Sequence, residues 1–364
     1  MTDAFPGPYD PGMAADISFR AERHAASFLD PRAGFDLARS DIEVRFDPLT
    51  GRASRLLSPR GVIEVAPADA PERPTGEHQD AGPASAPCIF CAPNVFDVTP
   101  KSALLSGGRH AVGEAFLFPN LFPYAKESAV CVYSTTHDVD LLSFDERRLA
   151  DALRATRDFV HLATRAHGPD IHPAVFGNYQ RPAGSSVAHP HLQAIADPVP
   201  LTVARERADG VEAYARATGR RWFDDLAAAE REAGRGIARL NCFDWIAPFA
   251  PRGSWHVQAI GHANRALEEQ SDHELEDLAD GLVRIFRTYR TVGVRSLNLL
   301  MVAGSAGDDP SRRFPPVLDI LARQTPGPEA RNDVTALEIL GGEPGIDVPP
   351  ESVADHARPF FAEL

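Results

Sequence analysis

Hydrophobic and polar positions along the chain fall into stretches typical of strands and of amphipathic helices. Short runs of apolar and β-branched residues predict strands within 43–51, 115–123, 129–133, 174–179, 255–260 and 296–302. Apolar residues three and four positions apart predict helices over 146–163 and 275–289. Residues 203–235, rich in Ala, Arg and Glu, predict further helices. The chain therefore combines both kinds of element, which indicates an α+β fold.

The order strand, histidine, helix, strand occurs twice along the chain. In the first half the strand at 129–133 is followed by His137 and then by the helix and strand described above. In the second half the strand at 255–260 is followed by His262, which lies 125 residues after His137. Because order and spacing agree, we predict a duplicated unit with antiparallel sheets and packed helices.

Composition and charge argue against several classes of protein. The chain has 364 residues, of which 43% are hydrophobic, so it can bury a core. With 37 basic and 51 acidic residues the net charge is −14, which argues against nonspecific binding of nucleic acid or of an anionic membrane. No apolar run of about 18 residues predicts a membrane span. The first residues lack the features of an export signal, so we expect a cytoplasmic protein.

The segment His189-Pro-His-Leu-Gln193 carries the strongest chemical signal. In an extended strand its first, third and fifth side chains face the same side, so two imidazoles and an amide project together. A loop of Gly184, Ser185 and Ser186 precedes them, and its backbone N–H groups can cradle phosphate oxygens while an imidazole attacks phosphorus. A pair of histidines on a solvated strand is the alternative interpretation.

Cys88-Ile-Phe-Cys91 predicts either a redox pair or half of a tetrahedral zinc site. A redox pair is expected at the start of a helix after a strand, whereas Pro87 and Pro93 place this motif in a loop. A zinc site needs two more ligands, which His137 and His189 can supply. Two structural cysteines with unrelated histidines remain the simpler alternative.

Together these residues resemble the galactose-1-phosphate uridylyltransferase family of the histidine-triad superfamily. The resemblance runs in order through nearly all of residues 40–345. Its landmarks are Arg45-Phe-Asp-Pro-Leu-Thr-Gly51, Arg73-Pro74, Cys88 with Cys91, Asn120-Leu-Phe-Pro123, Ser134-Thr-Thr-His137, Phe176-Gly-Asn178, Gly184-Ser-Ser186, His189-Pro-His-Leu-Gln193, Pro315-Pro316 and Glu338-Ile-Leu340.

The resemblance implies an α+β fold of duplicated histidine-triad-like units. It places an N-terminal arm at 1–40, a first unit with the zinc and catalytic motifs at 41–200 and a helical connection at 201–240. A second unit would span 241–345 and a C-terminal tail 346–364. It also suggests a homodimer.

The same resemblance implies transfer of a nucleoside monophosphate between a sugar nucleotide and a sugar 1-phosphate. His191 would be the nucleophile that carries the nucleotide, with Gln193 donating to phosphoryl oxygens as charge develops. Asn120, Asn178, Gly184, Ser185 and Ser186 would contact the substrate. One structural zinc per chain would be held by a set of four ligands, Cys88, Cys91, His137 and His189.

The chain also departs from the family pattern. The family's late His-x-His, which holds a second metal, is replaced by Ser311-Arg-Arg-Phe314, and the acidic residue expected after Asn120 is Leu121. Galactose and uridine specificity are therefore not inherited. A phosphorylase that uses inorganic phosphate to cleave a nucleotide sugar or a dinucleoside polyphosphate is the second candidate. A zinc-stabilised nucleotide-binding module without activity is the third.

Overall fold

A computed structural model describes residues 17–30, 36–57, 88–138, 140–323 and 334–362, without the side chains of 24–30, 36–41 and 57. Ten strands form one antiparallel sheet in the order β4-β5-β6-β8-β7-β12-β13-β11-β10-β9. Their bounds are β4 His110–Val112, β5 Ala115–Pro119, β6 Glu127–Val132, β7 His172–Tyr179, β8 His191–Asp197, β9 Gly236–Arg239, β10 Phe243–Ile246, β11 Val257–Gly261, β12 Ser296–Val302 and β13 Val317–Arg323.

The strand order contains the predicted duplication. One half reads β4-β5-β6-β8-β7 and the other, from its own edge, β9-β10-β11-β13-β12, so the two halves meet where β7 pairs with β12. Helix α2 (Glu146–His167) lies between β6 and β7 in the chain, as α5 (Asp272–Thr291) lies between β11 and β12. The α+β fold of duplicated units is therefore confirmed.

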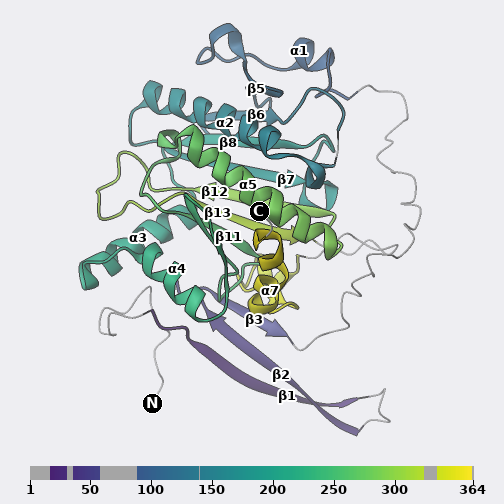
Figure 1. Cartoon of the computed structure of the whole chain (residues 1–364), viewed down its shortest axis with the longest axis vertical. Coiled ribbons are helices and arrows are strands. Elements are labelled where there is room, and N and C mark those ends of the chain that lie inside the picture. Colours follow the sequence, from purple (N-terminus) through teal and green to yellow (C-terminus); the bar gives the residue numbers. More distant parts are fainter. Residues whose placement is uncertain (1–16, 31–35, 58–87, 139, 324–333, 363–364) are drawn as a thin grey trace.

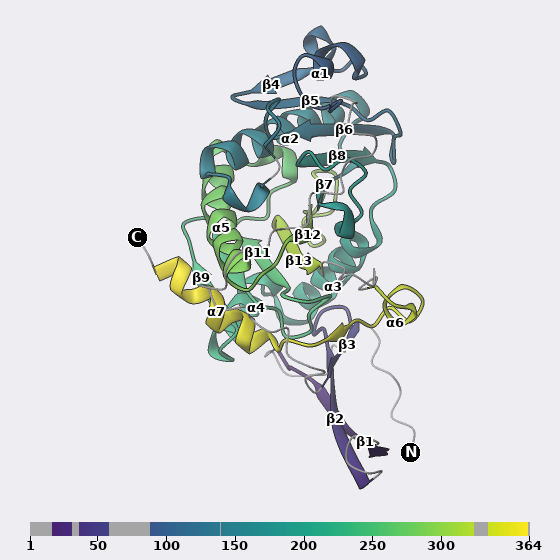
Figure 2. The same ribbon diagram turned by 90° about the vertical axis from the view of Figure 1, so that its right-hand side faces the viewer.

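The two faces of the large sheet are covered by different helices (Figures 1 and 2). Side chains of α2 and α5 pack on one face, in the largest apolar cluster, against Leu192, Leu299 and Leu318 of the central strands. Helices α3 (Thr202–Thr218) and α4 (Trp222–Glu232) pack on the other face against part of the second half. Because side chains alternate along a strand, residues next to Leu192, such as His191 and Gln193, face away from α2.

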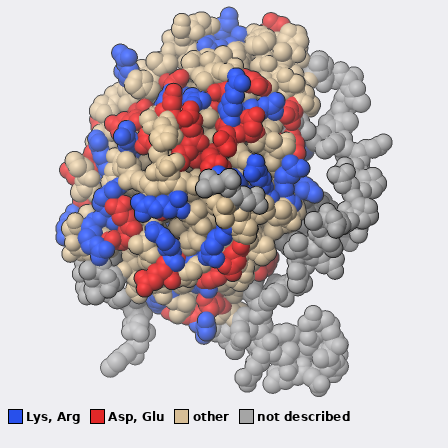
Figure 3. Space-filling view, viewed as in Figure 1, with Lys and Arg blue, Asp and Glu red and all other residues tan. Residues whose placement is uncertain are grey.

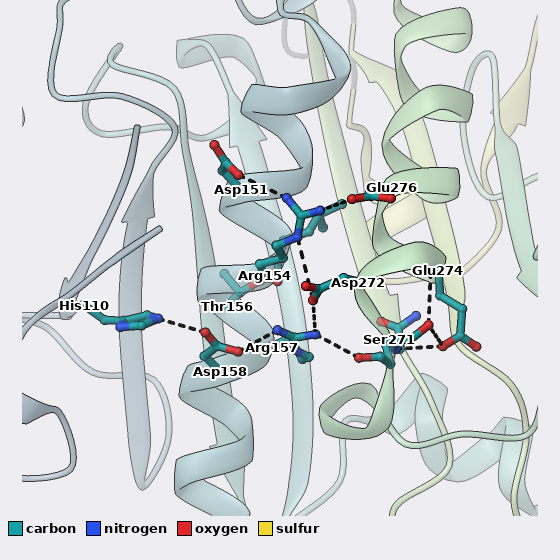
Figure 4. Close-up of polar contacts among 12 residues, drawn as sticks. His110, Asp151, Arg154, Thr156, Arg157, Asp158, Ser271, Asp272, Glu274 and Glu276 are labelled. Carbon is teal, nitrogen blue, oxygen red and sulfur yellow. Dashed lines mark hydrogen bonds and ion pairs between the residues drawn. The ribbon is translucent and has the colours of Figure 1, made fainter. Parts of the chain in front are cut away.

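Helices α2 and α5 are joined by arginines as well as by apolar packing (Figure 4). Arg157 donates to Asp272 at 2.7 Å and to Asp158 at 3.0 Å, and Asp158 contacts His110 at 2.9 Å. Arg154 pairs with Glu276 of α5. On this side of the molecule acidic and basic side chains are interspersed, without a large basic area (Figure 3).

A second sheet, ordered β1-β2-β3-β14, contains β1 Ala21–Asp30, β2 Asp36–Phe46, β3 Ala53–Leu57 and β14 Gly345–Ile346. Much of the arm expected at 1–40 thus forms β1 and the start of β2. The stretch expected as a tail contains α7 (Pro350–Ala362), which contacts α5 and β9. Short helices α1 (Asn94–Val98) and α6 (Ala336–Ile339) complete the fold.

The proposed division into five segments stays a prediction, and the Pro- and Ala-rich stretch at 64–87, with Arg73-Pro74, lies outside the described residues. In the described part of the chain, none of the helices is long and apolar enough to cross a membrane.

Candidate active site and metal-binding group

The predicted catalytic segment lies at the start of β8, in the first half of the sheet. His191 pairs with Val132 of β6, while Gln193 lies between Val130 of β6 and Phe176 of β7. Both side chains are 8% exposed. The prediction that His189 shares their strand is wrong in one respect, because β8 begins only at His191 and the ring of His189 turns toward the two thiols.

The four predicted metal ligands lie together. Their ligand atoms, from Cys88, Cys91, His137 and His189, all lie within 4.8 Å of one another. The Sγ of Cys91 is 3.2 Å from His137 Nδ1 and 3.6 Å from His189 Nδ1. Sulfur and nitrogen atoms bound to one tetrahedral metal lie about 3.6 Å apart. Donor types and spacing therefore fit a metal ion.

Hydrogen bonding fixes which nitrogen of His189 can bind the metal. Its Nε2–H donates to the carbonyl of Ser134 at 2.7 Å, which leaves Nδ1 to face the thiols. Burial lowers the pKa of His189, so the ring is neutral near pH 7, as a ligand must be. Burial and the neighbouring Cys88 raise the pKa of the Cys91 thiol to about 12, so metal binding has to displace its proton.

His191 is oriented by the backbone of His189, one of the four candidate metal ligands. Its Nδ1–H donates to the carbonyl of His189 at 2.8 Å, which places the lone pair on Nε2. Burial lowers the pKa of His191, so this nitrogen is unprotonated near neutral pH. A neutral, oriented imidazole of this kind is suited to nucleophilic attack.

Phe90, which lies between Cys88 and Cys91, contacts the rings of both His189 and His191. Its ring meets His191 edge-to-face at 5.3 Å between centroids and His189 at 6.1 Å. Phe90 also packs with Val95, Phe118, Val130 and Val132 in a small apolar cluster. Phe90 was not predicted from the sequence as a site residue, although its place inside the Cys-x-x-Cys motif puts it next to two candidate metal ligands.

Gln193 is held by one of the predicted substrate-binding residues. Asn120 Nδ2 donates to Gln193 Oε1 at 3.2 Å, and Asn120 Oδ1 accepts from the N–H of Phe122 at 3.0 Å. The amide nitrogen of Gln193 is thereby the end that can donate to a phosphoryl oxygen.

Asn178 is fixed from the second half of the molecule. Its Oδ1 accepts from Asn298 Nδ2 at 2.6 Å, so its own NH₂ group is left as a donor. Asn298 also donates to the carbonyl of Ala183 at 2.9 Å and accepts from Arg323 at 2.7 Å. Asn298 was missed too, although an amide within the apolar strand 296–302 was a signal.

The loop at 181–186 differs from the expected phosphate cradle. The N–H groups of Gly184 and Ser185 donate to the carbonyls of Arg181 and Gln180, and the Ser185 hydroxyl donates to the carbonyl of Val187. Gly184 has a φ of 91°, which favours glycine. Ser185 is buried, whereas Ser186 is exposed.

The two arginines that replace the family's late His-x-His have structural partners. Arg312 pairs with Asp209 at 2.6 Å and with Glu212 at 2.7 Å, both on α3. Arg313 donates to the carbonyls of Ala306 and Asp308. His262 contacts Asp244 at 3.2 Å within the second half.

Comparisons with known proteins agree with this architecture. A curated, uncharacterised protein of Archaeoglobus fulgidus is 26% identical over 349 residues, covering 96% of this chain and all of that protein. The crystal structure of an ADP-glucose phosphorylase from Arabidopsis thaliana with bound ADP-glucose gives a TM-score of 0.67 at 21% identity, covering 87% of this chain and 98% of the other. The chain has the uridylyltransferase fold. A solved uridylyltransferase gives a TM-score of 0.62 at 19% identity, with coverage of 87% and 98%.

No protein-family model matches the chain. The fold agrees with the expected galactose-1-phosphate uridylyltransferase-like architecture.

Proposed function

We propose that this protein is a nucleotidyltransferase that moves a nucleoside monophosphate between a sugar nucleotide and a sugar 1-phosphate. The observation that carries the proposal is the orientation of His191. Its Nδ1–H is bonded to the carbonyl of His189, so Nε2 is presented as a nucleophile beside Gln193. Similarity to enzymes of this fold, one of them solved with ADP-glucose, supports the same class of substrate.

In the first step Nε2 of His191 would attack the α-phosphorus of the nucleotide sugar. A bond forms between nitrogen and phosphorus, and the bond from phosphorus to the bridging oxygen breaks, which releases the sugar 1-phosphate. This leaving group needs no proton, so an amide at position 193 is sufficient. In the second step the incoming phosphate oxygen takes the nucleotide from His191.

Neutral donors surround the position that the α-phosphoryl group would occupy. The amide oxygens of Gln193 and Asn178 both accept hydrogen bonds from neighbouring asparagines, which leaves their NH₂ groups as donors. With the hydroxyl of Ser186 they can donate to phosphoryl oxygens as charge develops. Since both amides are fixed before substrate binds, little reorganisation is needed.

Zinc is the metal we propose for the Cys88, Cys91, His137 and His189 group. Four protein ligands would close its coordination sphere, so zinc would hold the segment before β8 in place. His189 binds through Nδ1 while its carbonyl orients His191, so the metal group and the nucleophile share one residue.

Inorganic phosphate is the second candidate acceptor. Arg312 and Arg313, which replace the late His-x-His, are used in contacts with α3 and with backbone carbonyls. Leu121 stands where the family carries an acidic residue, and it is 68% exposed. These departures favour a phosphorylase as the alternative. A homodimer stays a prediction from the resemblance, and a location in the cytoplasm stays a prediction from the sequence of the first residues.

The experiment incubates the purified protein with a panel of nucleoside diphosphate sugars. One series adds glucose 1-phosphate or galactose 1-phosphate, and the other adds inorganic phosphate. We expect exchange of the sugar in the first series. Release of nucleoside diphosphate only in the second would select the phosphorylase, and turnover in neither series would contradict both.

A further inference from the structure

A cavity of about 220 Å³ lies in the second half of the molecule. It is enclosed by the turn at 47–52, by α3 and α4, by the segment 248–252 and by strands β11, β12 and β13. Trp222, Phe249 and Leu300 provide apolar walls, while Glu206, Arg207, Arg252 and Gln258 are among its polar lining residues. Its volume is several times the share of one water molecule in the liquid.

The strand order places this cavity on the face of the second half that corresponds to the face with His191 and Gln193 in the first half. In β5, β6 and β8, Phe118 pairs with Val130 and Val130 with Gln193. In β10, β11 and β13, Ile246 pairs with Gln258 and Gln258 with Asp319 in the same way. When Phe118 is matched to Ile246, Asp319 corresponds to Gln193, and residues 248–251 correspond to 120–123, which include Asn120.

Buried polar atoms of the cavity lining lack partners. Arg207 is 8% exposed; its Nη2 donates to Asp319 at 2.8 Å, whereas its Nη1 has no hydrogen-bond partner among the described residues. The Nη1 of Arg252 and the Oε2 of Glu206 are also buried without a hydrogen-bond partner among the described residues. Buried donors left unpaired are costly, so groups that enter the cavity gain by pairing with them.

Of the three arginines in the lining, Arg252 is the one that forms no ion pair with a described residue. Arg52 pairs with Glu206 at 2.7 Å, Arg207 with Asp319, and Glu230 with Arg235. Asp47 accepts from the N–H groups of Leu49 and Thr50. Within the described residues, the guanidinium of Arg252 has no carboxylate partner and donates only to the carbonyl of Gly342 at 3.1 Å, while its backbone N–H donates to His256.

We propose that this cavity is a second ligand site, for a compact organic anion of about the size of one sugar ring. Its phosphate or carboxylate group meets Arg252 and Nη1 of Arg207. Its ring packs against Trp222, Phe249 and Leu300, and a hydroxyl donates to Glu206 Oε2. The proposal does not rest on the proposed nucleotidyl transfer, because its residues belong to the second half of the molecule.

The test titrates the full-length protein with glucose 1-phosphate, with glucuronate and with glucose, by calorimetry and tryptophan fluorescence. The first two probes carry a phosphate and a carboxylate on a similar ring, and glucose is the neutral control. Because Trp222 lines the cavity, we expect both anions, or the preferred one, to change fluorescence, and the Trp222→Phe variant to lose that change. Arg252→Gln should weaken binding by roughly tenfold or more.

Two controls separate this site from the catalytic one. Arg216→Gln removes an exposed arginine of α3, which pairs with Glu212, and should leave binding unchanged. His191→Ala should retain the Trp222-dependent signal. Arg207→Lys keeps a charge for Asp319 but removes Nη1, and should weaken binding as well. The proposal is overturned if no anion binds below about 10 mM, if glucose binds equally well, if Arg252→Gln binds as the wild type does, or if the signal is lost with His191.

Discussion

At the residue scale, His189 and His191 differ in what their ring nitrogens contact. His189 directs Nδ1 to the thiols and Nε2–H to the carbonyl of Ser134, whereas His191 directs Nδ1–H to the carbonyl of His189. The sequence predicted both residues, because two imidazoles in this segment accompany a Cys-x-x-Cys motif. It did not predict Phe90 or Asn298, since their contacts depend on elements far apart in the chain.

The metal group gives a first prediction. Cys88→Ser and Cys91→Ser should each lose the bound metal and lower the melting temperature, because metal binding contributes to folding in a closed four-ligand site. Cys242→Ser is the matched control, a half-buried cysteine outside the group. Elemental analysis of the wild type should give about one zinc per chain. Fully active, metal-free wild-type protein would contradict the prediction.

Asp319 gives a prediction about pH. Burial alone would raise the pKa of this carboxyl, but Arg207 and His256 lower it well below its usual range. A lowered pKa stabilises the fold above the unfolded value of about 4, and this contribution is lost as the pH falls below it. Asp319→Asn should cost about 3–5 kcal/mol at pH 7, since Arg207 is left buried without its partner.

Urea unfolding between pH 7 and pH 3 measures this effect. The difference between the wild type and Asp319→Asn should narrow below about pH 4, because the carboxyl of the unfolded wild-type chain then takes up a proton while that of the folded protein stays ionised. If the free energies of unfolding of the two proteins differ by the same amount from pH 7 to pH 3, the ionisation of Asp319 does not stabilise the fold as predicted.

At the scale of elements, periodicity predicted the long helices and several strands of the sheet. The buried positions Leu149, Leu153 and Val160 of α2 have the spacing that the sequence indicated. Strands β4, β9 and β10 have only 3 or 4 residues, too few for a period to be recognised. The pairing of β1 with β2 was not predicted either, because each of these strands depends on its partner strand rather than on a local pattern.

The packing of α5 on β10 gives a prediction for Gly281. A Cβ at this position would lie 2.1 Å from Cζ2 of Trp245, which is fully buried. Gly281→Ala should therefore destabilise the protein by about 2 kcal/mol, because the overpacking exceeds the gain in helix propensity. Gly253→Ala, whose Cβ would meet Leu321 at an ordinary 3.4 Å, is the control and should change the melting temperature little. Equal melting temperatures would contradict this packing.

At the scale of the whole molecule, the two halves have the same strand order but carry different side chains. The first half holds the metal group and His191, and the second supports it through Asn298 and through the ion pairs between α2 and α5. The order of the two units was evident from the sequence. Their union in one ten-stranded sheet was not, because it depends on the pairing of β7 with β12.

The central claim is that His191 carries the nucleotide. The most direct measurement incubates the protein with nucleoside diphosphate sugars labelled at the α-phosphate and isolates the denatured protein under basic conditions, in which a phosphorus–nitrogen bond survives. The wild type should retain label, released by acid, on the peptide that contains residue 191. His161→Ala, an exposed histidine of α2, should label equally, and His191→Ala not at all while its melting temperature and metal content stay those of the wild type. Label that persists in His191→Ala, or its absence from the wild type with every donor, would contradict the account.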